Sequence, residues 1–294
     1  MVKVAVAGGS QGLGSAIVAG IEARGIDECF ILSRTARQDD HRYLAVDYTS
    51  IDNIRDMLEQ NNIDTVISAL AMENGGGEAQ LNLSEGAELS GSTRRFMPSE
   101  FGIVYLENSK TLEHARFSNG QFLDYITAPR VPTPLAFAPP IWLDLQNNFA
   151  VIPGDGTAPV VVTHTSDVGH YVAALLGLPQ WEKRYHLIGD RCSIGEMARI
   201  AEEVKGVEFE KHFETRETLV SGQRRMPPVH KEVLPGGLEE ALMPFLAASG
   251  VMTIDGEMDL GLDAGGGATN VNGLFPELRT RTVREALGIW VKSG

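Results

Sequence analysis

The chain has 294 residues, 43% of them hydrophobic, and a formal net charge of −14. This length allows one large or two ordinary domains, and the apolar content is ample for a packed core. The acidic balance argues against a nucleic-acid surface, which would need a basic footprint. The chain begins as a strand without a leader, no apolar run approaches roughly 18 residues, and two cysteines form neither a disulfide framework nor a zinc set. We therefore expect a cytoplasmic protein with no metal site and no membrane partner.

The first element is a short apolar strand, residues 2–7, which leads into a turn rich in glycine. Leu13, Ile17 and Ile21 then recur at the spacing of one helical face. Strand, glycine turn and helix open a dinucleotide-binding fold, in which the helix N-terminus faces a pyrophosphate. The G-x-x-x-G-x-G spacing is similar to that of short-chain dehydrogenases, and the alternative is a plain turn without a ligand. The resemblance to this group of enzymes implies that Gly8, Gly9, Ser10, Gln11, Gly12 and Leu13 hold the pyrophosphate.

The second strand is expected over residues 28–34, and its end is where such folds contact the ribose. Arg34 lies 20 residues after Gly14, and Arg37 follows. An acid at this place suits NAD, whereas an arginine suits the 2′-phosphate of NADP, so we favour NADP(H). The alternative is that Arg34 is only a solvated charge.

Further strands are expected over residues 44–47 and 63–70, with helices after Ser50 and over residues 78–90. This alternation predicts an α/β fold with a doubly wound parallel sheet of the Rossmann type. Later, Ser166 or Asp167 is expected to cap a helix. Residues 207–250 show only short alternating strand and helix signals, and two capping boxes are expected to begin helices at Ser193 and Thr282.

Several stretches resemble one known family. Residues 96–102, Phe-Met-Pro-Ser-Glu-Phe-Gly, are similar to the strand-end signature of the NmrA-like and isoflavone-reductase-like group of atypical short-chain dehydrogenases. Collinear stretches that resemble its fungal members cover nearly the whole chain; they are residues 116–125, 151–156, 163–168, 185–190 and 281–287.

The resemblance implies an NADP-binding Rossmann domain over residues 1–126, with residues 157–177 added to it, and a smaller α+β substrate domain over residues 127–294. It implies that Ser68 and Ala69 border the nicotinamide and that the substrate lies under residues 119–149. Asn119 and Phe122 are the candidate substrate contacts. A monomer or homodimer with a small-molecule substrate is expected.

The chain departs from the family after Gly102. Reductases of the group carry a proton-donating lysine on a helix that follows this glycine, but only nine residues separate Gly102 from Leu112. A parallel crossover needs at least about 10–12 residues. Lys110 is the only lysine between Lys3 and Lys183 and is the candidate catalytic residue. Two explanations stay open: a segment is missing from this sequence, or the protein is a natural variant with an altered catalytic face.

Two functions are consistent with these residues. The first is an NADPH-dependent oxidoreductase that reduces a small carbonyl or enone substrate, in secondary metabolism. The alternative is a regulatory or redox-sensing protein that binds NADP(H) without turnover. Likeness of fold is only an associational argument for either function.

Overall fold

The computed structural model describes residues 1–72, 75–99, 111–234, 236–260 and 267–293. The chain divides into two compact units, each made from three stretches. Unit 1 comprises Met1–Ser118, Thr165–Leu187 and Gly265–Leu278, and unit 2 comprises Asn119–His164, Ile188–Ala264 and Arg279–Gly294. From the segment 157–177, unit 1 takes helix α5 (Thr165–Leu175) and unit 2 takes strand β11 (Pro159–Thr163).

A parallel sheet forms the centre of unit 1. Its order is β3-β2-β1-β4-β5-β6, and every described pairing in it is parallel. The central strands are almost wholly buried because helices cover both faces, which explains their continuous apolar sequences. The predicted doubly wound α/β fold is confirmed. The strand bounds are β1 Lys3–Ala7, β2 Glu28–Ser33, β3 Tyr43–Ala45, β4 Thr65–Ser68, β5 Arg95–Met97 and β6 Glu113–His114.

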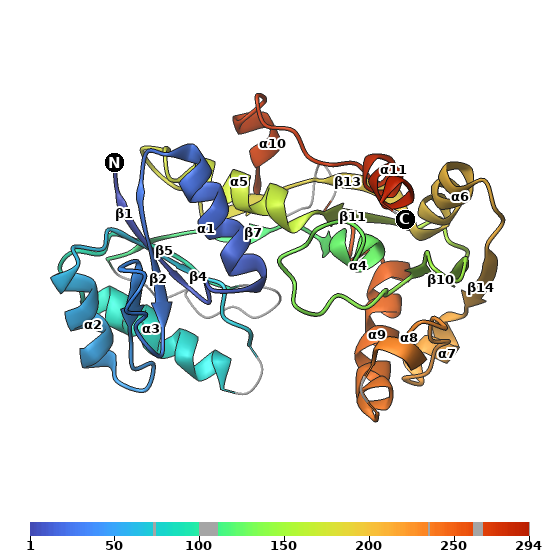
Figure 1. Ribbon diagram of the computed structural model, residues 1–294, viewed down its shortest axis with the longest axis horizontal. Coiled ribbons are helices and arrows are strands. Elements are labelled where there is room, and N and C mark those ends of the chain that lie inside the picture. Colours follow the sequence, from blue (N-terminus) through green and yellow to red (C-terminus); the bar gives the residue numbers. More distant parts are fainter. Residues whose placement is uncertain (73–74, 100–110, 235, 261–266, 294) are drawn as a thin grey trace. The chain divides into compact units, whose positions relative to one another are not determined.

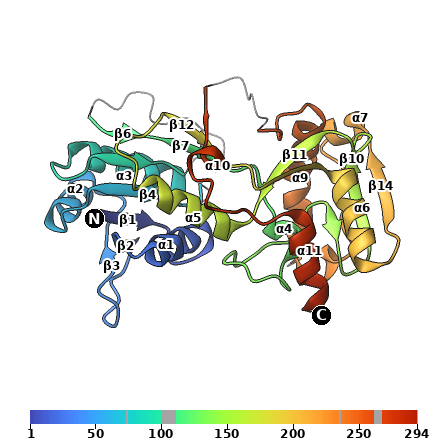
Figure 2. The same ribbon diagram turned by 90° about the horizontal axis from the view of Figure 1, so that it is seen from above.

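Helices α1 (Gly12–Arg24) and α5 pack together on one side of this sheet, and α2 (Ile51–Gln60) and α3 (Gly76–Leu89) pack together on the other (Figure 1). Figure 2 shows the strands between these two helix layers. The first pair crosses very closely, because a Cβ atom on Gly20 would lie 2.3 Å from the carbonyl oxygen of Gly169. Two glycines at the crossing let the backbones touch.

A second small sheet of unit 1 has the order β15-β12-β7. It joins Thr269–Asn270, Arg184–His186 and Arg116–Ser118, which come from three distant parts of the chain. Helix α10 (Val271–Leu274) follows directly after β15. These strands show why the unit is discontinuous in sequence.

Unit 2 has two three-stranded sheets with the orders β14-β10-β9 and β13-β11-β8. Its core gathers residues from both sheets and from several helices, with Trp142, Leu143 and Leu287 among the most buried. The strands are β8 Gln121–Phe122, β9 Leu143–Asp144, β10 Phe149–Pro153, β13 Asp190–Ser193 and β14 Glu210–Glu214, together with β11. The helices are α4 Asp124–Thr127, α6 Ile194–Lys205, α7 Arg216–Val220, α8 His230–Val233, α9 Leu238–Ile254 and α11 Val283–Lys292.

Local capping predictions had mixed outcomes. Both capping boxes are present, at Ser193 and at Thr282, and Ser50 caps α2 through the N–H of Asn53. The expectation that Ser166 or Asp167 caps a helix is wrong, because α5 already begins at Thr165. The expectation of short alternating segments over residues 207–250 is also wrong from Leu238 onward, where α9 runs for 17 residues with Pro244 inside it.

None of the helices in the described ranges is both long and apolar enough to cross a membrane.

Candidate functional site

The candidate site lies at the carboxyl ends of the central strands of unit 1. The order of the sheet reverses between β1 and β4, and in open α/β sheets ligands bind outside the strand ends at such a point. Ala7 at the end of β1 pairs with Leu32 on one side and Ser68 on the other. This register brings the turn after β1, the loop after β2 and the residues after β4 to one edge.

The turn after β1 is built from backbone in close contact. Gly8 has a φ of +77°, and a Cβ atom there would lie 2.6 Å from the carbonyl oxygen of Ala69. A Cβ atom on Gly14 would lie 2.2 Å from the carbonyl oxygen of Gly8. Gly12 has a φ of +58° but faces open space. Two glycines therefore close the turn against its neighbours, while the third leaves room for a ligand beside the backbone.

The N-terminus of α1 is open to an anion. Its cap residue, Gln11, is extended and makes no side-chain cap hydrogen bond, and the first turn contains no acidic residue. Ser15 Oγ donates to the carbonyl of Gly12 at 2.8 Å, so it does not occupy an N–H group. Ser10 and Gln11 are exposed. The first N–H groups of a helix lack intrahelical partners and attract negative charge, so this end of α1 can hold a phosphate.

Two arginines follow β2 with their guanidinium groups available. Arg34 and Arg37 are exposed, and within the described ranges no carboxylate forms an ion pair with either of them. Arg37 stacks on the ring of Tyr43, with its guanidinium carbon 3.9 Å from the ring centroid. Arg42 differs, because it pairs with Asp40 and Glu22. The loop therefore presents the guanidinium groups of Arg34 and Arg37 to an anion, while Arg42 neutralises the carboxylates of Asp40 and Glu22.

Buried polar groups lie beside the end of β4. Ser68 is 4% exposed, and its Oγ has no hydrogen-bond partner in the described structure. Gln80 of α3 is also buried; its Oε1 accepts from the N–H of Ser99 at 2.8 Å, and its Nε2 has no hydrogen-bond partner among the described residues. Ser99 Oγ donates to the carbonyl of Leu70 at 3.0 Å. Buried polar atoms are nearly always paired, so Ser68 and Gln80 leave hydrogen-bonding capacity for a bound group.

The sequence predicts a role for Ser68 and Ala69 but not for Gln80. Nothing in the sequence distinguishes Gln80, since a glutamine in a helix of moderate pattern is usually exposed. Ser99 belongs to the stretch that carries the family resemblance, and that could have directed attention to it.

The other predicted residues lie elsewhere. Lys110 lies outside the described residues. Asn119 is buried in unit 2, where its Nδ2 donates to the carbonyl of Gly120 at 3.1 Å and its own carbonyl accepts from Thr163 Oγ1 at 2.7 Å. Phe122 is half-buried, with its ring centroid 6.1 Å from that of Tyr125. The structure groups Phe122 with unit 2 and Gly8 with unit 1.

Neither a metal-ligating cluster nor a cysteine with a lowered pKa occurs in the described part of the chain. No cluster of three or more metal-ligating side chains occurs there. Cys29 is buried in β2, and burial raises the pKa of its thiol to about 12. A thiol with so high a pKa is a poor nucleophile near neutral pH.

No family model matches the chain. The oxidoreductase BOA1 of Botryotinia fuckeliana is 36% identical over 303 residues, which cover 95% of this chain and 96% of BOA1. The chain belongs to the family of BOA1. A more distant relative, the oxidoreductase swnN of Metarhizium robertsii, is 27% identical over 338 residues. The alignment covers 97% of this chain and 96% of swnN.

Solved structures show that this BOA1 family member has the fold of the isoflavone-reductase-like group, as the motifs predicted. Leucoanthocyanidin reductase of Vitis vinifera in complex with NADPH superposes with a TM-score of 0.72 at 17% identity, over 99% of both chains. AtPrR2 with NADP⁺ and (+)pinoresinol gives a TM-score of 0.72 at 19% identity, over 98% of both chains. An isoflavone reductase gives 0.71 at 17% identity, over 97% of this chain and 98% of its own.

Proposed function

We propose that the protein is an NADPH-dependent oxidoreductase that reduces a small carbonyl or enone compound of secondary metabolism. The observation that carries the proposal is the combination, at one sheet edge, of a closed glycine turn, a helix N-terminus without a side-chain cap and two guanidinium groups that form no ion pair with a carboxylate of the described residues. The family relative BOA1 is named an oxidoreductase, and the neighbour from Vitis vinifera holds NADPH.

In this proposal each group has a separate task. The N–H groups of the first turn of α1 hold the pyrophosphate, with Gly8 to Leu13 forming its cradle. Arg34 and Arg37 hold the 2′-phosphate, to which a guanidinium can donate two hydrogen bonds. Ser68 and Ala69 border the nicotinamide, and Gln80 adds a buried donor near them. NADPH, when bound, supplies the hydride.

The substrate is proposed to meet Asn119 and Phe122, which precede the proposed substrate domain of residues 127–294 in the sequence and belong to unit 2 of the structure. Carbonyl reduction also needs a proton, and Lys110 is the proposed donor because of its place after Gly102. A lysine suits this role where its surroundings bring its pKa toward neutrality. The protein is proposed to work in the cytoplasm as a monomer or homodimer.

The test is a fluorescence titration of the purified protein with NADPH and with NADH. We expect the wild type to bind NADPH more tightly and Arg34→Ala to lose most of this preference. A charge-assisted contact of this kind corresponds to about a tenfold to hundredfold change in affinity. The matched control is Arg55→Ala, which removes an arginine of α2 that pairs with Asp52 and Asp56. Equal affinity of the wild type for both coenzymes would contradict the proposal.

A second candidate function is binding of NADP(H) for regulation without turnover. One sequence observation favours it: only nine residues separate Gly102 from Leu112, too few for the helix on which reductases of the group carry their proton-donating lysine. A panel of carbonyl and enone substrates separates the two functions. Steady NADPH oxidation with any substrate would rule out the regulatory function. Saturable NADPH binding without oxidation of NADPH by any substrate would rule out the reductase function.

A further inference from the structure

The loop between β2 and β3 is fixed to the sheet at its far end. Tyr43 is the first residue of β3 and pairs with Ile31 of β2. Its N–H donates to the carbonyl of Asp40 at 3.1 Å, and Arg37 forms an isolated antiparallel bridge with Asp40. The loop therefore folds back on itself, and the ring of Tyr43 comes from the rigid sheet rather than from the loop.

The charges of this loop are divided between two kinds of arginine. Arg42 donates from Nε to Asp40 Oδ1 at 2.8 Å and also pairs with Glu22. The hydrogen bond from Arg42 lowers the pKa of Asp40 to about 2, so this carboxylate stays ionised and paired with Arg42. Arg42 is therefore paired with carboxylates of the protein itself. The cations left for an external anion are Arg34 and Arg37, which outnumber the remaining loop acid, Asp39.

Stacking distinguishes Arg37 from an ordinary exposed arginine. Its guanidinium lies over the ring of Tyr43 at 3.9 Å from the centroid. Stacking covers one face of the planar group but leaves its N–H edges uncovered, and those edges are what a phosphate recognises. Holding the side chain in place before binding also reduces the entropy lost when the phosphate arrives.

We propose that Tyr43 is a positioning residue that sets coenzyme preference by holding Arg37 ready for the 2′-phosphate beside Arg34. This inference rests on the proposed function, because it concerns how the same site selects the phosphorylated coenzyme. Arg34 follows β2 directly and contacts the phosphate from the strand end. Arg37 contacts it from the loop, and Tyr43 does not itself touch the coenzyme.

The experiment compares dissociation constants for NADPH and NADH in the wild type, Tyr43→Ala and Tyr43→Phe. Tyr43→Ala is expected to weaken NADPH about threefold to tenfold and to change NADH less than twofold, since NADH lacks the phosphate. Tyr43→Phe keeps the aromatic face and is expected to retain wild-type affinity for both. A thermal melt of each variant shows whether β3 stays folded.

The outcomes separate the two proposals. Equal weakening of NADPH and NADH by Tyr43→Ala, or a Tyr43→Phe variant as weak toward NADPH as Tyr43→Ala, overturns the role of the stacked ring. In one outcome the wild type prefers NADPH, Arg34→Ala removes the preference for NADPH, and Tyr43→Ala leaves it unchanged. This outcome overturns only the role of Tyr43 and leaves the proposed function standing. A wild type that does not prefer NADPH overturns the proposed function and this inference with it.

Discussion

The carbonyl oxygen of Gly8 lies 2.2 Å from the position that a Cβ atom of Gly14 would occupy. Gly14→Ala must therefore push the turn after β1 away from the start of α1. We expect the variant to bind NADPH at least about tenfold more weakly, because the displaced backbone no longer presents its N–H groups together, and to lose about 1–3 kcal/mol of unfolding free energy. Fluorescence titration and urea unfolding measure the two effects.

The control for this variant is Gly288→Ala on α11, where an added Cβ atom meets nothing within 4 Å. It should leave NADPH affinity unchanged. Wild-type affinity in Gly14→Ala would show that the tight turn is not part of the coenzyme site.

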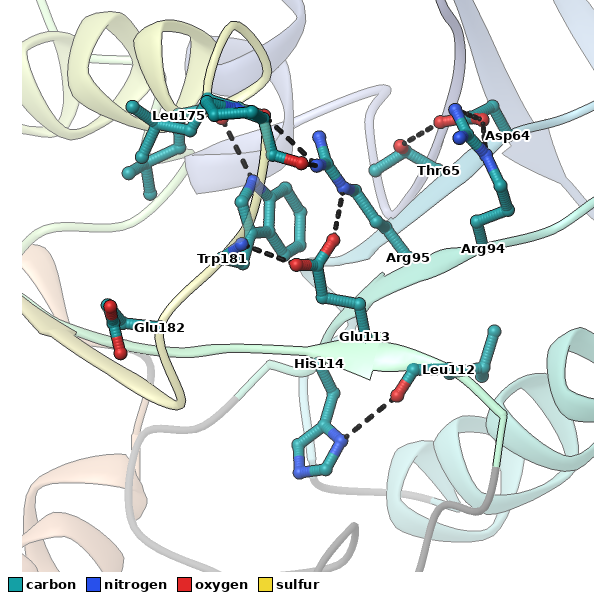
Figure 3. Close-up of polar contacts among 12 residues, drawn as sticks. Asp64, Thr65, Arg94, Arg95, Leu112, Glu113, His114, Leu175, Trp181 and Glu182 are labelled. Carbon is teal, nitrogen blue, oxygen red and sulfur yellow. Dashed lines mark hydrogen bonds and ion pairs between the residues drawn. The ribbon is translucent and has the colours of Figure 1, made fainter.

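The edge of the main sheet is fastened by a partly buried ion pair (Figure 3). Arg95 Nε donates to Glu113 Oε2 at 2.6 Å, while Glu113 Oε1 accepts from the N–H of Trp181 at 2.5 Å. Since the Arg95 side chain is only 10% exposed, Glu113→Gln leaves a poorly hydrated charge. We expect a loss of about 1–3 kcal/mol in unfolding free energy by urea titration.

The neighbouring pair of Arg94 and Asp64 provides the comparison, because the Arg94 side chain is 72% exposed. Arg94→Ala should cost less than about 1 kcal/mol, as exposed pairs usually do. Similar losses for Arg94→Ala and Glu113→Gln would mean that burial does not set the strength of the Arg95 pair.

Acid should weaken the fold through His186. This side chain is 4% exposed, neither ring nitrogen has a hydrogen-bond partner in the described structure, and burial lowers the pKa of the imidazole. Below about pH 6.5 the unfolded chain takes up a proton that the folded chain does not, so unfolding free energy falls as the pH falls toward the lowered folded pKa. Unfolding measured from pH 7 to pH 5 should show a shallower decline for His186→Leu than for the wild type.

His170 of α5 is exposed, and His170→Gln is the matched control, expected to keep the wild-type decline. An unchanged decline in His186→Leu would assign the acid sensitivity to other groups. His114 and His230 are the candidates, since burial lowers the pKa of both.

Arg42 should influence coenzyme preference without contacting the coenzyme. Arg42→Ala releases the carboxylates of Asp40 and Glu22 near the proposed phosphate position. We expect NADPH to bind several-fold more weakly and NADH to be nearly unaffected. Adding Asp40→Asn to Arg42→Ala should restore much of the lost affinity, and a double-mutant cycle measures this coupling. Additive effects of the two substitutions would argue against neutralisation as the role of Arg42.

Local signals in the sequence predicted the parts of the fold that depend on neighbours along the chain. The capping boxes at Ser193 and Thr282 are examples, because both partners lie within four residues. The parallel sheet followed from the alternation of buried strands and helices. Helix α9 was not predicted because Pro244 interrupts the helical pattern in the sequence. In addition, its apolar residues do not share one face, since Phe245 is exposed and Leu246 is buried.

The site was predictable to the extent that it consists of backbone. Glycine spacing predicted the turn at Gly8, and distance along the chain selected Arg34, which the structure places exposed directly after β2. The burial of Gln80, whose Nε2 has no partner among the described residues, and the stack of Arg37 on Tyr43 depend on contacts across the folded unit, so no spacing rule could give them. The beginning of α5 at Thr165 is a similar case, since the close contact of Gly169 with α1 is tertiary.

The chain passes from one compact unit to the other five times along its length. The first stretch of unit 1 therefore cannot complete that unit during translation, because the last strand of the unit, Thr269–Asn270, comes from its third stretch. After the central sheet ends at β6, more than a hundred further residues are translated before β15 completes unit 1. No single cleavage separates the two units from each other intact, so separate expression of either unit will require joining distant segments with designed linkers.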